Sequence, residues 1–161
     1  MQRKKRNWKL KPEQEIDPVY VRKTAMDYLA RREHSKRELT RKLTSRGFDA
    51  EIVEATVATF ISDDLLSDSR FAEAFVHSRF QRGSGPQKIH AELRERGIED
   101  CLISACVEAF DEQWQERIRE VREKKFGASL PQDFKERSQQ MRFLQQRGFT
   151  ADQISGVFKD E

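Results

Sequence analysis

The chain has 161 residues and a formal net charge of +3, with 37% charged residues, 36% hydrophobic residues, seven Gly and four Pro. This composition favours a soluble, helix-rich protein, because sheet proteins need more turn residues and β-branched runs. No apolar run approaches the roughly 18 residues that cross a membrane, and no apolar segment follows the basic start as in a secretory signal, so we expect a cytoplasmic protein.

Residues 1–17 are expected to form a basic, disordered N-terminal arm. The first eleven residues, MQRKKRNWKLK, hold six basic and no acidic residues. Such an arm is a candidate for contacts with nucleic acid, because clustered cations attract phosphates. The residues that would make these contacts are Arg3, Lys4, Lys5, Arg6 and Trp8.

Residues 18–62 are predicted to form a first three-helix repeat. Asp17 precedes Pro18, a pair typical of a helix start, and the apolar spacing that follows predicts a helix to about Arg32. Ser35 and Glu38 are spaced as a reciprocal capping box at the start of the second helix. The residues expected in the core of this repeat are Val21, Ala25, Tyr28, Leu29, Leu39, Leu43, Ile52, Val53, Val57 and Phe60.

Residues 63–110 are predicted to form a second repeat of the same design. Ser67 or Asp68 caps its first helix, and Ser84 to Gln87 fits a second capping box with Pro86 in the first turn, where a missing amide costs little. The expected core residues are Phe71, Phe75, Val76, Phe80, Ile89, Leu93, Leu102, Ile103, Cys106, Val107 and Phe110.

Residues 111–161 are predicted to form a third, more divergent repeat. Gln140 stands where the other two repeats have an apolar residue eight positions before a glycine, so its apolar stripe has shifted. Thr150 and Gln153 form a third capping box. The expected core residues are Trp114, Ile118, Val121, Met141, Phe143, Leu144, Ile154, Val157 and Phe158.

An Arg-Gly pair followed by an apolar residue closes the second helix of each repeat. The glycines are Gly47, Gly97 and Gly148, and glycine adopts the left-handed conformation of a helix C-terminus without penalty. This spacing predicts an all-α fold of three tandem three-helix repeats in an elongated, curved array. A compact nine-helix bundle with the same periodicities is the alternative.

The sequence contains no recognisable catalytic or metal-binding pattern. The three histidines, His34, His77 and His90, lie in different segments without ligand spacing, and His34 is expected to be exposed. Cys101 and Cys106 are interpreted as small buried residues rather than a disulfide. We therefore expect a binding protein with no enzymatic activity, cofactor or metal.

Basic residues gather near helix ends in the first two repeats, where they are suited to an acidic protein surface or to phosphates. Solvated helix faces are the plain alternative. For Arg46, Arg96 and Arg147, a favourable interaction of about 0.3–1 kcal/mol with the helix dipole is the preferred explanation. The candidate partner-binding residues are Arg31, Arg32, Lys36, Lys42, Arg79, Arg82 and Lys88.

Three blocks carry a family resemblance: ARREHSKRELTRKLTSRGF, LLSDSRFAEAFVHSRFQRGSGPQKIHAELRERGI, and KKFG with RFLQQRGF. In order and spacing, over about residues 22–159, they resemble the RecX family, regulators of the RecA recombinase. The resemblance implies a curved protein of three three-helix repeats. It also implies binding in the groove of the RecA–DNA filament, with inhibition of the ATPase, strand-exchange and coprotease activities used in DNA repair and homologous recombination.

The basic rows and the arm leave a second function open. A monomeric helical protein could bind single- or double-stranded DNA directly, with its cations following the phosphates. No helix rich in Arg, Asn and Gln is evident for reading bases, so such binding would be directed at the backbone.

Overall fold

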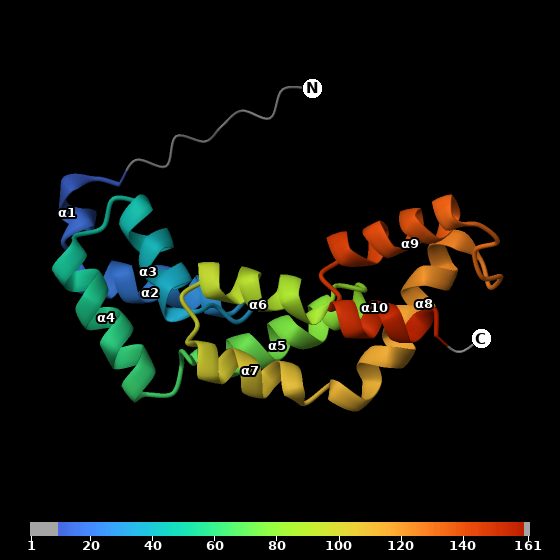
Figure 1. Ribbon diagram of the computed structural model, residues 1–161. Helices are drawn as coiled ribbons and strands as arrows, with labels where there is room; N and C mark the ends of the chain where they lie inside the picture. The colour runs from blue at the N-terminus through green and yellow to red at the C-terminus, as the bar shows by residue number, and fades with distance from the viewer. Residues whose placement is uncertain (1–9, 160–161) are drawn as a thin grey trace, which may run out of the picture. The chain divides into compact units, whose positions relative to one another are not determined.

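Residues 10–159, the part that the computed structural model describes, form helices joined by turns and loops, with no strand in that range (Figure 1). This confirms the predicted all-α class. The helices are α1 (Pro12–Glu15), α2 (Pro18–Leu29), α3 (Lys36–Ser45), α4 (Ala50–Ser62), α5 (Asp68–Gln81), α6 (Pro86–Glu95), α7 (Asp100–Glu108), the 3₁₀ turn η1 (Asp111–Gln113), α8 (Trp114–Phe126), α9 (Phe134–Gln146) and α10 (Ala151–Val157).

The helices divide into two compact units, one ending at Phe71 and the other beginning at Ala72. In the first unit, α2, α3 and α4 pack around one apolar core, and the stripe of Leu39 and Leu43 on α3 is fully buried there as predicted. The buried core residues of this unit are Val21, Ala25, Leu39, Leu43, Phe48, Val53, Val57, Phe60 and Leu66.

The segment before α2 differs from the expected disordered arm. Leu10 packs against the core of the first unit, Pro12 begins the single turn of α1, and the backbone amide of Asp49 donates a hydrogen bond of 2.9 Å to the carbonyl oxygen of Glu15. Residues 10–17 are therefore folded onto the first repeat, because Leu10 gains burial that charge counting did not reveal. The candidate arm residues Arg3 to Trp8 lie outside the described residues.

Local signals set most of the helix ends. The predicted stop glycines, Gly47, Gly97 and Gly148, have φ values of +103°, +79° and +91°, which L side chains rarely adopt. Asp17 caps α2 through the amide of Val19. The Thr150 box at the start of α10 forms in both directions, as predicted.

Two predicted capping boxes form differently. Ser35 accepts from the amide of Glu38, but the Glu38 carboxylate binds Arg32 instead of returning to the cap. At α6 the cap residue is Gly85, which has no side chain to offer, and Ser84 is buried. Between the two cap candidates of α5, Ser67 accepts from the amide of Arg70.

The second unit is built around an aromatic cluster. The ring of Phe80 lies 4.7 Å from that of Phe110 and 5.0 Å from that of Trp114, and Trp114 meets Phe149 edge-on at 6.4 Å. These contacts join the end of α5 to α8 and to the turn before α10. The other fully buried residues of the unit include Val76, Ile89, Leu93, Ile103, Ile118 and Leu144.

The turn before α6 meets the end of α9 backbone to backbone. The amides of Gly85 and Gln87 donate to the carbonyl oxygens of Arg147 and Gly148, at 2.7 and 2.9 Å. The contact is so close that a Cβ on Gly85 would lie 2.3 Å from the carbonyl carbon of Gly148. A glycine is required here by the approach of a second backbone, since Gly85 has an ordinary φ of −81°.

A buried arginine explains the polar residue in the apolar stripe of α9. Arg122 of α8 donates 3.0 Å hydrogen bonds to the carbonyl oxygens of Ala128 and Ser129, and one of 3.4 Å to the buried Gln140 side chain. A buried cation requires such partners. Gln140 thus supplies an acceptor for Arg122, and the pair holds the loop between α8 and α9.

Candidate partner-binding surfaces

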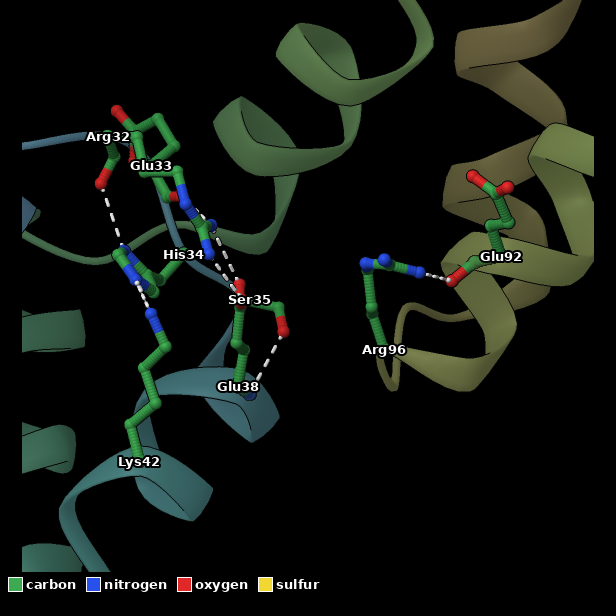
Figure 2. Close-up of polar contacts among 8 residues, drawn as sticks. All are labelled: Arg32, Glu33, His34, Ser35, Glu38, Lys42, Glu92 and Arg96. Carbon is green, nitrogen blue, oxygen red and sulfur yellow. Dashed lines mark hydrogen bonds and ion pairs between the residues drawn. The ribbon is translucent and has the colours of Figure 1, made fainter. Parts of the chain in front are cut away.

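Arg32, at the end of α2, is bound to α3 by two hydrogen bonds. Its guanidinium donates to both oxygens of Glu38, at 3.0 and 2.6 Å, and to the carbonyl oxygen of Glu33 (Figure 2). These charge-assisted hydrogen bonds lower the pKa of the Glu38 carboxyl. Such bidentate pairs fix geometry as well as charge, so Arg32 has a structural role in this repeat.

Lys42 is tied to the same junction through His34. The ammonium group of Lys42 lies 2.9 Å from Nε2 of His34, whose Nδ1 lies 3.0 Å from the carbonyl oxygen of Arg32 (Figure 2). Lys42 also lies over the ring of Tyr28, at 5.1 Å. His34 is 1% exposed, so the expectation that it is exposed was wrong: it fills the space between α2 and α3.

Arg31 and Lys36 are exposed, like Arg32, but unlike Arg32 they are not bound to Glu38. Within the described chain, neither side chain has an acidic partner, although the backbone amide of Lys36 donates to Asp68 at 2.7 Å. Their charges are therefore available to a binding partner.

Arg79, in the second unit, is engaged internally. Its Nε lies 2.7 Å from a carboxylate oxygen of Glu92, and its guanidinium lies over Phe75 at 4.8 Å. Arg96 lies near the same ring, at 4.7 Å, and donates a 2.7 Å hydrogen bond to the carbonyl oxygen of Glu92 (Figure 2). These arginines connect α5 to the end of α6.

Arg82 and Lys88 are exposed. Arg82 lines a cleft that also holds cations from the third repeat, namely Arg117, Lys124, Lys125 and Arg147. Sequence reasoning omitted Lys124 and Lys125 because it looked for basic rows in the two well-preserved repeats. The adjacent lysines in the last turn of an expected helix were the available signal.

No candidate metal centre is present in the described part of the chain. No group of three metal-ligating side chains occurs among residues 10–159. Cys106 is buried, and burial raises the pKa of its thiol, whereas Cys101 is exposed, contrary to expectation, because it lies on the outer side of α7. None of the helices over these residues is long and apolar enough to cross a membrane.

Family models for the first, second and third three-helix domains of RecX match residues 22–60, 67–107 and 111–158. The chain belongs to the RecX family. Regulatory protein RecX of Halorhodospira halophila is 47% identical over 134 residues, which are 83% of each chain. Regulatory protein RecX of Pseudomonas syringae pv. tomato is 44% identical over 137 residues, 85% of this chain and 88% of that one.

Solved RecX structures share the fold. The crystal structure of RecX from Lactobacillus salivarius matches with a TM-score of 0.77 at 20% identity, over 89% of this chain and 95% of that one. A second crystal structure, of a regulatory protein RecX, matches with the same TM-score at 21% identity, over 89% of this chain and 72% of that one. The fold of three three-helix domains, predicted from the repeated Arg-Gly stops, is thereby confirmed.

Proposed function

We propose that this RecX-family chain regulates RecA by binding in the helical groove of the RecA–DNA filament. There it would lower the ATPase, strand-exchange and coprotease activities. The observation that carries the proposal is the match of all three RecX domains, in order, together with relatives named as regulatory proteins. Such a protein would act as a cytoplasmic monomer without catalytic activity of its own.

The residues proposed to touch the filament are the exposed cations Arg31, Lys36 and Lys88. Exposed charges raise the association rate with an oppositely charged surface and help to set specificity. Of the other candidates on the first two repeats, Arg82 lies in the cleft with the cations of the third repeat, whereas Arg32, Lys42 and Arg79 have partners inside their own units. We assign Arg32, Lys42 and Arg79 a structural role, in which they stabilise the repeats that carry the exposed cations.

The repeat boundaries are part of the same proposal. We place the first repeat at residues 18–62, the second at 63–110 and the third at 111–161. A tandem array of three repeats would let one molecule contact several neighbouring subunits of a filament.

The test is RecA-catalysed ATP hydrolysis on single-stranded DNA, measured while the purified chain is titrated in. We expect a dose-dependent decrease. The variant Arg31→Glu, Lys36→Glu, Lys88→Glu should need about tenfold more protein for the same decrease, since three exposed ion pairs at about 0.5 kcal/mol each amount to roughly a tenfold change in affinity.

The matched control is Lys23→Glu, Arg37→Glu, Lys135→Glu, which reverses three other exposed charges. It should inhibit like the parent chain, and all three proteins should have the same helical circular dichroism. Equal inhibition by the two variants would remove these three residues from the proposed surface. A parent chain that leaves ATP hydrolysis unchanged at saturation would refute the proposed function.

A further inference from the structure

The cleft beside Arg82 is formed entirely within the second unit. Its walls come from the C-terminal end of α5, from α8 between Arg117 and Lys125 and from the end of α9, and its volume is about 670 Å³. The backbone contact between Gly85 and Gly148 holds the α5–α6 turn against the end of α9, and so fixes two of these walls. The lining residues are Gln81, Arg82, Gly83, Arg117, Glu120, Val121, Lys124, Lys125, Phe143 and Arg147.

One of the five cations is neutralised within the cleft. Arg117 lies 2.6 Å from a carboxylate oxygen of Glu120, and it donates hydrogen bonds to the carbonyl oxygens of Phe80 and Gln81. These bonds tie α8 to the end of α5. Arg117 and Glu120 thus form a structural pair that adds no net charge.

The remaining cations, Arg82, Lys124, Lys125 and Arg147, have no acidic partner in the described chain. Arg147 lies over the ring of Phe143 at 5.3 Å, while the side chains of Arg82, Lys124 and Lys125 are exposed. Like charges gathered in one cleft repel one another, and this cost is not offset by carboxylates among the lining residues beyond Glu120.

Helix dipoles account for only part of this clustering. The C-termini of α5, α8 and α9 reach the cleft, and each contributes roughly half a negative charge. Three such ends supply about −1.5 against four uncompensated positive charges. A surplus of more than two positive charges is left for a ligand.

We propose that this cleft binds the sugar–phosphate backbone of a single nucleic-acid strand directly, without RecA. Lys124, Lys125 and Arg82 would contact successive phosphates, with Arg147 held in place on Phe143. A cleft of about 670 Å³ suits a short stretch of one strand. Because the ring of Phe143 is already engaged by Arg147 and by Phe126, no free aromatic face is offered to a base, so binding would be independent of sequence.

The lining favours a nucleic acid over an acidic peptide. Peptide sites usually provide a sheet edge for pairing or apolar pockets for anchoring side chains. The described chain has no strand, and Val121 and Phe143 are the apolar side chains among the lining residues, with Phe143 covered. A regularly charged chain that needs no apolar anchor fits this cleft better.

The test measures binding of the full chain to a fluorescein-labelled 20-nucleotide oligothymidylate, without RecA, at salt concentrations from 50 to 200 mM. The test variant is Arg82→Gln, Lys124→Gln, Lys125→Gln. Three phosphate contacts on a single strand give a slope of about −2 in log K against log salt. The slope of the variant should therefore be shallower than that of the parent by about two units. Over this salt range, the parent should lose about 20-fold more affinity than the variant.

The matched control is Lys23→Gln, Arg37→Gln, Lys135→Gln, which removes the same charge from exposed positions outside the cleft. It should keep most of the slope. An equal loss of slope in both variants would mean that the net charge alone attracts DNA. An unchanged slope in the cleft variant would mean that any binding occurs elsewhere. Either result overturns the proposal. A 20-residue polyglutamate that binds as tightly as the oligonucleotide, and loses binding in the cleft variant, would assign the cleft to an acidic peptide instead.

The two proposals fail separately. This experiment contains no RecA, and its variant keeps Arg31, Lys36 and Lys88. Inhibition of RecA without oligonucleotide binding would leave the proposed function standing and remove the cleft site. Oligonucleotide binding without inhibition of RecA would keep the cleft site and refute the proposed function.

Discussion

His34 is the buried link in a chain of hydrogen bonds between α2 and α3. Its Nδ1 faces the carbonyl oxygen of Arg32, and its Nε2 faces the Lys42 ammonium group. Because a carbonyl accepts and an ammonium group donates, only the neutral imidazole, with its proton on Nδ1, satisfies both contacts. A second proton would place two positive groups 2.9 Å apart.

Burial lowers the pKa of His34, and the nearby charges of Arg32 and Lys42 act in the same direction, while the hydrogen bond to the Arg32 carbonyl and the charge of Glu38 oppose them. A lowered histidine pKa means that the unfolded chain binds more protons. The stabilising effect is complete above the ordinary pKa of about 6.5 and is lost as the pH falls below it. Glu38 acts in a separate window, because its lowered pKa affects stability only near and below pH 4.5.

The first prediction concerns the variant His34→Gln. Glutamine can donate and accept but does not titrate, so the fall in unfolding free energy between pH 7.5 and 5.5 should be smaller than in the parent chain. A single proton limits the contribution of His34 to the parent's slope to about 1.4 kcal/mol per pH unit. Urea titrations at several pH values measure how the unfolding free energy changes with pH. A slope in His34→Gln that equals the parent's slope would contradict this account.

At the scale of helices, the features that depend on local rules could be predicted from the sequence. Gly47 and Gly148 could be recognised as helix stops because the left-handed turn depends on the residue itself. The stripe of Leu39 and Leu43 followed from helical periodicity. The burial of His34 depends on how a loop packs between two helices, so neighbouring residues in the sequence carried no sign of it.

The cleft was beyond sequence reasoning for a similar reason. Arg82 and Lys124 are distant in the chain and are brought together by the hydrogen bonds of Arg117 to the carbonyl oxygens of Phe80 and Gln81, while the contact of Gly85 with Gly148 adds the end of α9. In the sequence, Gly85 stands between the predicted cap Ser84 and Pro86, where a turn residue is expected. Nothing in its own surroundings in the sequence indicated that another backbone would lie against it.

The second prediction separates close packing from backbone strain. Gly85 has an ordinary φ but would clash with Gly148, whereas Gly127 has a φ of +89° and open space around it. Gly85→Ala should cost about 2–4 kcal/mol, from overpacking and weakened hydrogen bonds. Gly127→Ala should cost about 1–3 kcal/mol, because a φ of +89° with a ψ of 173° is a backbone conformation that essentially only glycine adopts. Denaturant unfolding gives both values.

Amide exchange shows where the cost of Gly85→Ala arises. The amide of Gln87 should exchange faster in this variant, because its acceptor is the carbonyl oxygen of Gly148, and it should stay protected in Gly127→Ala. Equal costs for the two variants, with Gln87 protected in both, would show that the close backbone contact adds nothing to stability.

For the whole molecule, the division at Phe71 and Ala72 implies two cores with separate stabilities. Leu43 lies at the centre of the first core, and Ile118 is equally buried in the second. In repeat proteins the total stability is approximately a sum of local terms and interactions between neighbours. A defect in one core should therefore loosen that unit more than the other.

The third prediction tests this with two matched core truncations, followed by hydrogen exchange of the full chain. Leu43→Ala should destabilise by about 2–5 kcal/mol and raise exchange in α2, α3 and α4, with smaller changes in α8 to α10. Ile118→Ala should give the reverse pattern at similar cost. Each variant is the other's control, since both delete buried aliphatic groups. Uniform loss of protection in both would mean that α5, which crosses the boundary, couples the two units into one cooperative structure.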